Sequence, residues 1–308
     1  MIILLILVIM MALTYWYTYP KLGHYLYFYG NTIEAKLYGF AQKNINIDGI
    51  SHSVWSNNNS TKPMLLLVHG FSASHAVWLR YAKHFTNDYH VVIPDLAGHG
   101  KTGYSEQQDY TIDAQAKRLI QLIHQMGSEN AHIVGNSMGG YIAAHMATYY
   151  PEMCLSIGLI DPAGLNSPKP SKMGLLISEG GNPFFINNDA EFGRFYNMTM
   201  ARPPYIPNVV KSALSQQYQM RREELVKIFE DFNRQHNYLA TELNKVKCPC
   251  LLIWGAKDEL IDVSCVEVWA GLLNCEQHVW HDLGHMPMLE APERTACATA
   301  EFLNRQKN

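Results

Sequence analysis

The sequence lacks the features that mark several common classes of protein. Its 24 Lys and Arg residues are outnumbered by 27 Asp and Glu residues, so the formal net charge of −3 provides no basic field for nucleic acid. It contains no Cys-x-x-Cys pair, no His-Glu-x-x-His spacing and no glycine-rich phosphate loop. We therefore expect no nucleic acid, no metal ion and no cofactor among its partners.

The proportions of the residue types predict one large core. Hydrophobic residues make up 48% of the chain and charged residues 17%, so its 308 residues can bury a single core that carries an insertion. Apolar segments that suit buried strands alternate with segments that suit helices, which predicts a mostly parallel sheet with helices on both faces. The expected strands are 64–68, 90–94, 131–135, 155–161 and 250–255, and the expected helices are 111–126 and 138–149.

A serine between two glycines is the strongest local signal. The sequence Gly-Asn-Ser-Met-Gly at positions 135–139 joins an expected strand to an expected helix. In a nucleophile elbow the chain turns so sharply that strand and helix nearly touch two residues before and two residues after the serine. Only residues without a Cβ fit both positions. We expect Ser137 to stand exposed above the sheet as a nucleophile.

A base and an acid follow this serine along the chain. Serine is a poor nucleophile until a base takes its proton, and histidine, with a pKa near neutrality, suits that task. His285 lies on a loop before the expected helix 292–302 and is the candidate base. Asp258 follows a buried strand and is the favoured acid to hold the imidazole in one tautomer, with Asp262 as the alternative.

These segments resemble the landmarks of the α/β-hydrolase superfamily, across nearly the whole chain after residue 45. The resemblance implies the α/β-hydrolase fold, with the acid and the histidine following the serine. It also implies an oxyanion hole formed by the backbone N–H groups of Phe71 and Met138, of which the second begins a helix. Besides the elbow, the landmarks are His69-Gly70-Phe71, Asp95-Leu96-Ala97-Gly98-His99-Gly100, Trp254-Gly255-Ala256-Lys257-Asp258 and Gly284-His285.

Two narrower resemblances point to different substrates. The segment Asp-Pro-Ala-Gly-Leu at 161–165, the segment 261–264 and the hydrophobic N-terminus resemble membrane-anchored monoacylglycerol lipases and related bacterial lipases. The segment Asn-Ser-Met-Gly-Gly at 136–140 is also similar to the elbow of hydrolases that break carbon–carbon bonds in ring-cleavage products. Both an acyl ester and a ring-cleavage product therefore stay open as substrates.

A helical cap is expected where the alternation of strands and helices stops, between residues 163 and about 245. Here prolines stand among methionines and phenylalanines. An apolar cap above a serine site suggests an acyl-chain pocket, while the same residues can equally form the small core of the cap itself. The candidate substrate-binding residues are Met173, Leu176, Phe184, Phe185, Phe195 and Met198.

The N-terminus carries a long stretch without charge. From Ile2 to Tyr19 there is no charged side chain, and eighteen residues at 1.5 Å each make about 27 Å of helix, just enough to cross a hydrocarbon core. We expect a single-pass anchor rather than a cleaved signal peptide, because a positive n-region and a small-x-small site are absent. Aromatic residues that suit the membrane interface end the stretch: Tyr15, Trp16, Tyr17 and Tyr19.

The charges and segments after this stretch complete the expected organisation. Lys21, Lys36 and Lys43 all follow it, which places the catalytic domain on the cytoplasmic side. The segment 22–40 either lies in the interface as an amphipathic helix or covers the hydrolase core. The expected parts are an anchor and interfacial segment over 1–45, the hydrolase core over 46–162 and 246–308, and the cap over 163–245.

The sequence supports one main function and two alternatives. The main hypothesis is a membrane-anchored serine hydrolase that cleaves carboxylic esters of lipid-like substrates, such as monoacylglycerols, through an acyl-enzyme. The first alternative is a carbon–carbon bond hydrolase of ring-cleavage products. The second is a noncatalytic receptor or scaffold with the hydrolase fold, against which the intact set of serine, acid and histidine argues.

Overall fold

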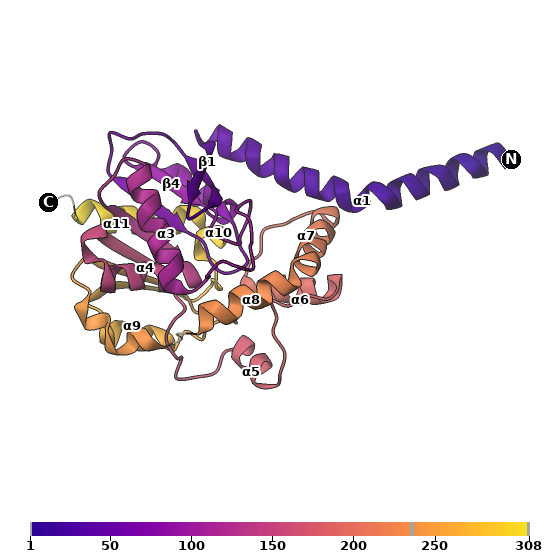
Figure 1. Ribbon diagram of the computed structural model, residues 1–308. Helices are drawn as coiled ribbons and strands as arrows, with labels where there is room; N and C mark the ends of the chain where they lie inside the picture. Colours follow the sequence, from indigo (N-terminus) through magenta and orange to yellow (C-terminus); the bar gives the residue numbers. More distant parts are fainter. Residues whose placement is uncertain (1, 235–236, 307–308) are drawn as a thin grey trace.

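An eight-stranded sheet forms the centre of the protein, for which a computed structural model describes residues 2–234 and 237–306 (Figure 1). The strand order is β1-β2-β4-β3-β5-β6-β7-β8. β1 pairs antiparallel with β2 and β2 with β4, whereas all later pairs are parallel, so the prediction of a mostly parallel sheet is confirmed. The strands are Ala41–Ile47, Ile50–Ser56, Met64–Val68, His90–Pro94, Ala131–Asn136, Cys154–Ile160, Cys250–Gly255 and Cys275–Trp280, in the order β1 to β8.

Helices cover both faces of the sheet, because side chains on a buried strand alternate between two cores. In β3, Leu66 belongs to the larger hydrophobic cluster and Leu65 to the smaller one. The helices α3 (Ile112–Gln125), α4 (Met138–Tyr149) and α9 (Cys265–Leu272) contribute to the larger cluster. The helices α2 (Leu79–Ala82) and α11 (Pro292–Arg305) contribute to the smaller cluster, and α10 (Pro287–Glu290) precedes α11.

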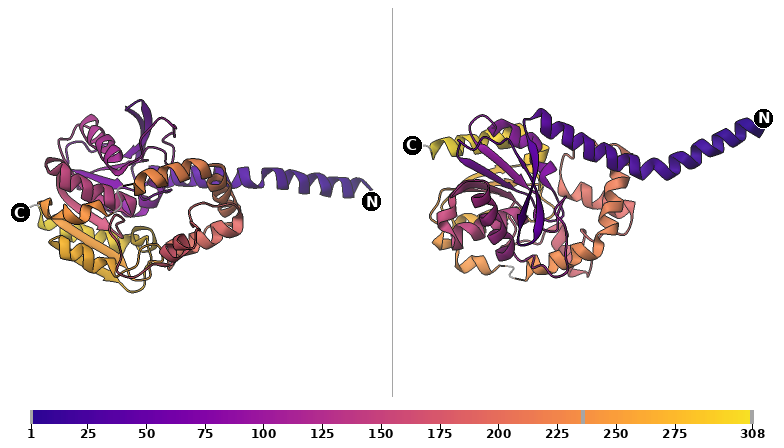
Figure 2. Two further views of the ribbon diagram at one scale, coloured as in Figure 1. Left: turned by 60° about the horizontal axis from the view of Figure 1, so that its bottom comes forward. Right: turned by 45° about the horizontal axis from the view of Figure 1, so that its top comes forward.

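The chain between β6 and β7 forms a set of helices to one side of the sheet. Figures 1 and 2 show α6, α7 and α8 on the side of the body from which α1 departs. Their apolar faces join the larger hydrophobic cluster, so the cap shares one core with the sheet. The helices are α5 (Lys172–Ser178), α6 (Asp189–Thr199), α7 (Asn208–Met220) and α8 (Arg222–Asn233).

The N-terminal helix α1 (Ile2–Leu37) lies against the cap and the core along its second half. Ala35 and the following Phe40 are buried in the smaller hydrophobic cluster. In its middle, α1 approaches α7 so closely that a Cβ on Gly23 would lie 1.9 Å from the carbonyl oxygen of Val209. The segment 22–40 therefore covers the hydrolase core, which is one of the two arrangements left open by the sequence.

The expected membrane span is not supported. Among the described residues, no helix has both the length and the apolar character needed to cross a bilayer. The strictly apolar run of α1 ends at Leu13, which gives about 18 Å of helix against a hydrocarbon core of about 30 Å, and hydroxyl-bearing residues follow. In the predicted aromatic belt, Tyr15 is exposed, while the side chains of Trp16 and Tyr17 lie outside the described set.

The close contact between α1 and α7 gives a test of the docking. We expect Gly23→Val to lower the melting temperature and to expose α1 to protease, because the new side chain must displace the backbone at Val209, and overpacking of this kind costs about 1–3 kcal/mol. Gly30→Ala is the matched control, since a Cβ there meets nothing within 4 Å. Equal melting temperatures and digestion patterns for the two variants would contradict this packing.

Candidate active site

Ser137 occupies a sharp turn between β5 and α4. Its φ of 56° and ψ of −120° lie in a region of backbone conformation that residues with a side chain rarely adopt. A Cβ on Gly135 would lie 2.1 Å from the carbonyl oxygen of Gly139, and a Cβ on Gly139 would lie 2.2 Å from that of Val68. The expected close contact between strand and helix is therefore present, and the turn leaves Ser137 partly exposed.

His285 and Asp258 form a buried hydrogen-bonded pair. His285 Nδ1 lies 2.7 Å from Asp258 Oδ2, and both side chains are buried. Asp258 Oδ1 accepts hydrogen bonds from the backbone N–H groups of Leu260 at 2.7 Å and Ile261 at 3.0 Å. Three donors therefore converge on this carboxyl group and fix its orientation toward the imidazole.

Asp262 has a different, local role in the structure. Its Oδ1 accepts from the backbone N–H of Ser264 at 2.9 Å, and its carbonyl oxygen accepts from Cys265, the first residue of α9. This is the helix-start arrangement that competes with a catalytic role for an aspartate at this position. The geometry thus favours Asp258 over Asp262 as the partner of His285.

The loop that carries His285 is held by polar groups from neighbouring elements. Asn136 Nδ2 donates to the carbonyl oxygen of His285 at 3.0 Å, so the elbow itself fixes the histidine loop. Glu290 Oε1 accepts from the N–H of Gly284 at 2.8 Å. The loop also packs against the end of β7, where a Cβ on Gly255 would lie 1.9 Å from the Gly284 carbonyl oxygen. Neither role was expected from the sequence, although Asn136 lies inside the elbow motif.

The loop after β3 brings Gly70, the residue before Phe71, against the elbow. Gly70 lies against Ser137, since a Cβ on Gly70 would be 3.1 Å from Ser137 Cβ. His69 Nδ1 donates to the Gly70 carbonyl at 2.8 Å and His69 Nε2 accepts from the Leu96 N–H at 3.0 Å, which defines a neutral tautomer. Burial lowers the pKa of His69, so this side chain orders the loop in its uncharged form.

A buried carboxylate supports the same loop. Asp95 Oδ1 accepts from the backbone N–H and from Nδ1 of His75, and Oδ2 accepts from the N–H of Lys101. Burial alone raises the pKa of Asp95, but the hydrogen bond and the charge interaction with His75 outweigh it and lower the value to about 2.

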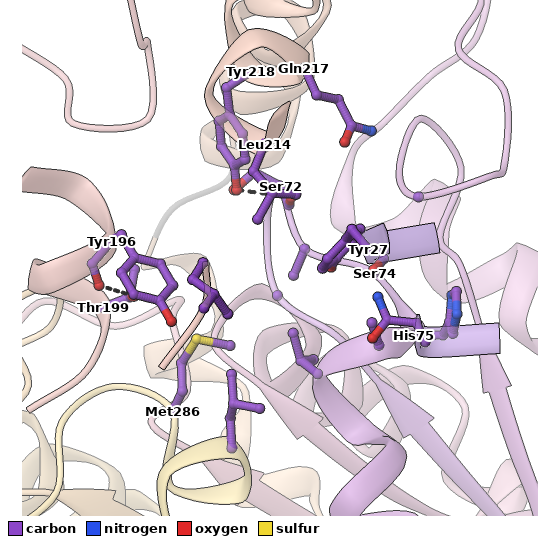
Figure 3. Close-up of a pocket in the computed structure, with 18 of the residues that line it drawn as sticks. Tyr27, Ser72, Ser74, His75, Tyr196, Thr199, Leu214, Gln217, Tyr218 and Met286 are labelled. Carbon is purple, nitrogen blue, oxygen red and sulfur yellow. Dashed lines mark hydrogen bonds between the residues drawn. The ribbon is translucent and has the colours of Figure 1, made fainter. Parts of the chain in front are cut away.

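The cap is tied directly to residues 69–74 after β3, the expected oxyanion loop. The hydroxyl of Tyr218 in α7 lies 2.9 Å from Ser72 Oγ and donates to the Ser72 carbonyl oxygen at 3.1 Å (Figure 3). Ser72 has a φ of 61°, so these bonds hold the loop in a conformation that its own backbone disfavours. The position of Phe71 therefore depends on the cap.

A cavity of about 580 Å³ opens at Ser137 and His285. Its apolar wall comes from the cap and includes Phe184 and Phe195, two of the predicted substrate-binding residues. The aromatic ring of Phe71 packs against Phe184 with ring centroids 4.9 Å apart, so the oxyanion loop and the cap share this wall. Further apolar or aromatic residues from the cap that line it are Phe192, Tyr196, Leu214, Tyr218 and Leu225.

Four of the predicted substrate-binding residues do not belong to the described lining of this cavity. Met198 is buried within the cap, and Met173, Leu176 and Phe185 pack against the larger hydrophobic cluster. The N–H of Met173 bonds to the carbonyl oxygen of Glu259, so α5 lies beside the loop of the acid rather than over the serine. These four side chains therefore pack in or against the larger hydrophobic cluster, and their role in substrate binding stays a prediction.

Helix α1 provides a second wall of the cavity, which was not expected from the sequence. Tyr27, labelled beside Ser74 in Figure 3, lines the cavity on the side opposite Tyr196 and Met286, and His24 and Asn31 line the cavity as well. Tyr27 lies beside the side chains of Ser74 and Asn31, and burial raises the pKa of its hydroxyl. No local pattern in the sequence indicates this contact, because it depends on how α1 docks.

One group of described residues comes near to a metal-binding arrangement. A side-chain oxygen of Asp161, one of Asp258 and a ring nitrogen of His285 all lie within 4.8 Å of one another. The His285 nitrogen that faces these carboxyl groups is already engaged by Asp258. These three groups can hydrogen-bond to one another without a metal ion if one of the carboxyl groups carries a proton.

Sequence comparison agrees with the fold. A family described as the alpha/beta hydrolase fold matches residues 63–292. The chain belongs to the α/β-hydrolase family.

Two curated relatives and one solved structure show which members of the family it resembles. Lipase 3 of Moraxella sp. (strain TA144) is 35% identical over 243 residues, which cover 78% of this chain and 77% of the relative. Human monoacylglycerol lipase ABHD6 is 30% identical over 254 residues, or 79% of this chain and 75% of the relative. The crystal structure of a membrane phospholipase A, described as a bacterial virulence factor, is 32% identical and covers all of this chain and 98% of its own, with a TM-score of 0.90.

The two aspartates after β7 can be separated by substitution. We expect Asp258→Asn to reduce kcat about 10⁴-fold, because an amide disfavours the imidazole tautomer that accepts the serine proton. We expect Asp262→Asn to change kcat by less than about tenfold, because it alters one local hydrogen bond. Both variants are compared at equal melting temperature, and a larger loss for Asp262→Asn would reverse the assignment.

Proposed function

We propose that the protein hydrolyses carboxylic esters of lipid-like substrates, such as monoacylglycerols, through an acyl-enzyme on Ser137. The observation that carries the proposal is the cavity, into which Ser137 and His285 open beneath an apolar cap wall. The lipases among the relatives support the same reaction class.

The proposed mechanism uses each group once in each half of the reaction. His285 takes the proton of Ser137 Oγ as that oxygen attacks the ester carbonyl carbon, and the N–H groups of Phe71 and Met138 donate to the developing oxyanion. His285 then gives the proton to the departing alcohol. A water molecule, deprotonated by His285, attacks the acyl group, releases the fatty acid and restores Ser137. Asp258 stabilises the imidazolium in both halves.

The two walls of the cavity differ in character, which suits a substrate with an apolar and a polar end. Aromatic side chains of the cap, such as Phe184 and Phe195, offer a surface for an acyl chain. The wall near α1 carries polar side chains, including Asn31, Ser74 and His75. We place the acyl chain under the cap and the alcohol portion toward α1.

The cations near the cavity bear on the carbon–carbon hydrolase alternative, which needs a group to bind a substrate carboxylate. Arg80 and Arg221 line the cavity but form ion pairs with Glu34 and Glu224 at 2.8 and 2.7 Å, and Lys101, which also lines it, donates to Gln42 Oε1 at 2.9 Å. Arg202 pairs with Asp282 and does not belong to the described lining. These pairings favour an uncharged ester over a carboxylated ring-cleavage product.

Replacement of the serine separates an enzyme from a receptor. We expect Ser137→Ala to reduce kcat for a chromogenic acyl ester by about 10⁴-fold or more while the melting temperature stays close to that of the wild type, because the change deletes the nucleophile and little packing. Wild-type turnover in the folded variant would refute the proposed nucleophile. An inactive wild type that still binds the ester would favour the receptor.

Chain-length preference separates the ester from the ring-cleavage product. Each buried CH₂ contributes about 0.8 kcal/mol, so we expect kcat/KM for monoacylglycerols to rise up to about fourfold per CH₂ until the cap wall is fully used. We expect Phe195→Ala to flatten this dependence and Phe185→Ala, outside the described lining, to leave its slope unchanged. Faster cleavage of a carboxylated dienone, or no response to acyl length, would contradict the lipase function.

The exposed apolar end of α1 supports attachment to a lipid surface. Residues 3–11 include large apolar side chains that are between 49% and 76% exposed, and none of them is charged. Exposed apolar surface of this extent on a helix is typical of contact with a lipid interface or another protein. The placement of the catalytic domain on the cytoplasmic side stays a prediction.

Truncation tests this attachment. We expect deletion of residues 1–19 to move the protein from the membrane fraction to the supernatant and to preserve hydrolysis of a soluble ester, because the described α1 residues of the cavity begin at His24. Deletion of residues 306–308 at the other end of the chain serves as the control. Retention of the truncated enzyme on membranes would show that another surface provides the attachment.

A further inference from the structure

A second aspartate lies beside the proposed catalytic pair and has no part in the mechanism above. Asp161 follows β6, has no exposed surface and adopts a φ of 44°. One of its carboxyl oxygens lies within 4.8 Å of ligand atoms of both Asp258 and His285. A buried carboxyl group at this distance affects the protonation of its neighbour, because two like charges so close repel strongly in a protein interior.

The two carboxyl oxygens of Asp161 differ in their hydrogen bonds. Oδ1 accepts from the backbone N–H of Gly255 at 2.9 Å. Oδ2 is buried and has no donor among the described residues. Two carboxylates cannot hydrogen-bond to each other, but a carboxylic acid can donate to a carboxylate. A proton on Asp161 would therefore satisfy its Oδ2 and give the neighbouring Asp258 a further donor.

The two carboxyl groups differ in a way that decides which of them holds the proton. Asp258 accepts from two backbone N–H groups and from His285, and each of these donors favours the ionised form. Asp161 accepts from one backbone N–H only. Burial, followed by the negative charge of Asp258, raises the pKa of Asp161 well above its usual range, and Glu290 adds to this.

We propose that Asp161 is a positioning residue that stays a neutral carboxylic acid and donates its proton in a hydrogen bond to Asp258. The donated bond spreads the charge of Asp258 and so reduces the pull of this carboxylate on the imidazole proton. Asp161 thereby keeps the proton affinity of His285 low enough for it to act as a base. This inference rests on the proposed function in assigning His285 that task.

Two substitutions distinguish a neutral donor from a charge. Asp161→Asn keeps a neutral side chain with an N–H donor, and asparagine tolerates a positive φ. Asp161→Gly removes the donor and also tolerates the positive φ. The readout is the acid limb of the pH dependence of kcat/KM for a soluble acyl ester, which reports the protonation of His285 in the free enzyme.

The pH of the acid limb is expected to shift differently for a neutral Asp161 and for an ionised Asp161. For a neutral Asp161, the acid limb of Asp161→Asn stays at the wild-type pH and its kcat/KM remains within about tenfold of the wild type. The limb of Asp161→Gly moves to higher pH by about one unit, because Asp258 loses a donor and its charge acts more strongly on His285. For an ionised Asp161, Asp161→Asn removes a negative charge, and its limb moves to lower pH. That shift, or an unshifted limb in a folded Asp161→Gly, would overturn the proposal.

A stability measurement tests the proton without any activity. A group whose pKa is raised on folding contributes stability below its unfolded pKa and loses it as the pH rises through the folded value. Asp161→Asn has no such proton, so its melting temperature relative to the wild type should increase between about pH 4 and pH 8. Asp258, His285 and Glu290, the titratable groups around Asp161, are present in both proteins. A constant difference over this range would overturn the proposal, even if the enzyme proved inactive on every ester.

Discussion

The site depends on backbone meeting backbone at the carboxyl ends of the central strands. Gly139 lies against the carbonyl of Val68, Gly135 against that of Gly139, and Gly255 against that of Gly284. A Cβ on any of these three glycines would overlap the carbonyl oxygen that it faces. The strands β3, β5 and β7 therefore bring the oxyanion loop, the serine and the acid to one point only because these positions lack a Cβ. The histidine loop reaches the same point through the Asn136 amide.

Much of this arrangement could be predicted from the sequence, because it follows from local sequence patterns. A strand buried on both faces appears as an unbroken apolar run, and the expected strands at Met64–Val68, His90–Pro94 and Cys250–Gly255 have the bounds seen in the structure. The elbow was recognisable because its steric demand falls on two glycines at fixed spacing. Asp258 was preferred over Asp262 for a local reason as well, since it follows the strand directly while Asp262 lies near the start of α9.

The remaining features depend on tertiary contacts that no local pattern records. The composition of the cap predicted an apolar pocket, yet it could not say which side chains face the cavity, and only Phe184 and Phe195 of the six candidates do so. The length of uncharged sequence overstated the apolar part of α1, because tyrosine and threonine carry no charge but hold hydroxyl groups. Asp161 belongs to a segment that resembles lipases, but its distance from Asp258 depends on the pairing of β6 with β7.

The cavity is bounded by three parts of the chain that are far apart in sequence, and they form one packed path. Gly23 of α1 lies against Val209 of α7, and Tyr218 of the same helix bonds to Ser72 in the oxyanion loop. The helix that bears the exposed apolar end thus supports the helix that fixes the Phe71 N–H. A displacement of the docked part of α1 would therefore act on the geometry of the oxyanion loop as well as on the wall of the cavity, because α1, α7 and this loop are packed in series.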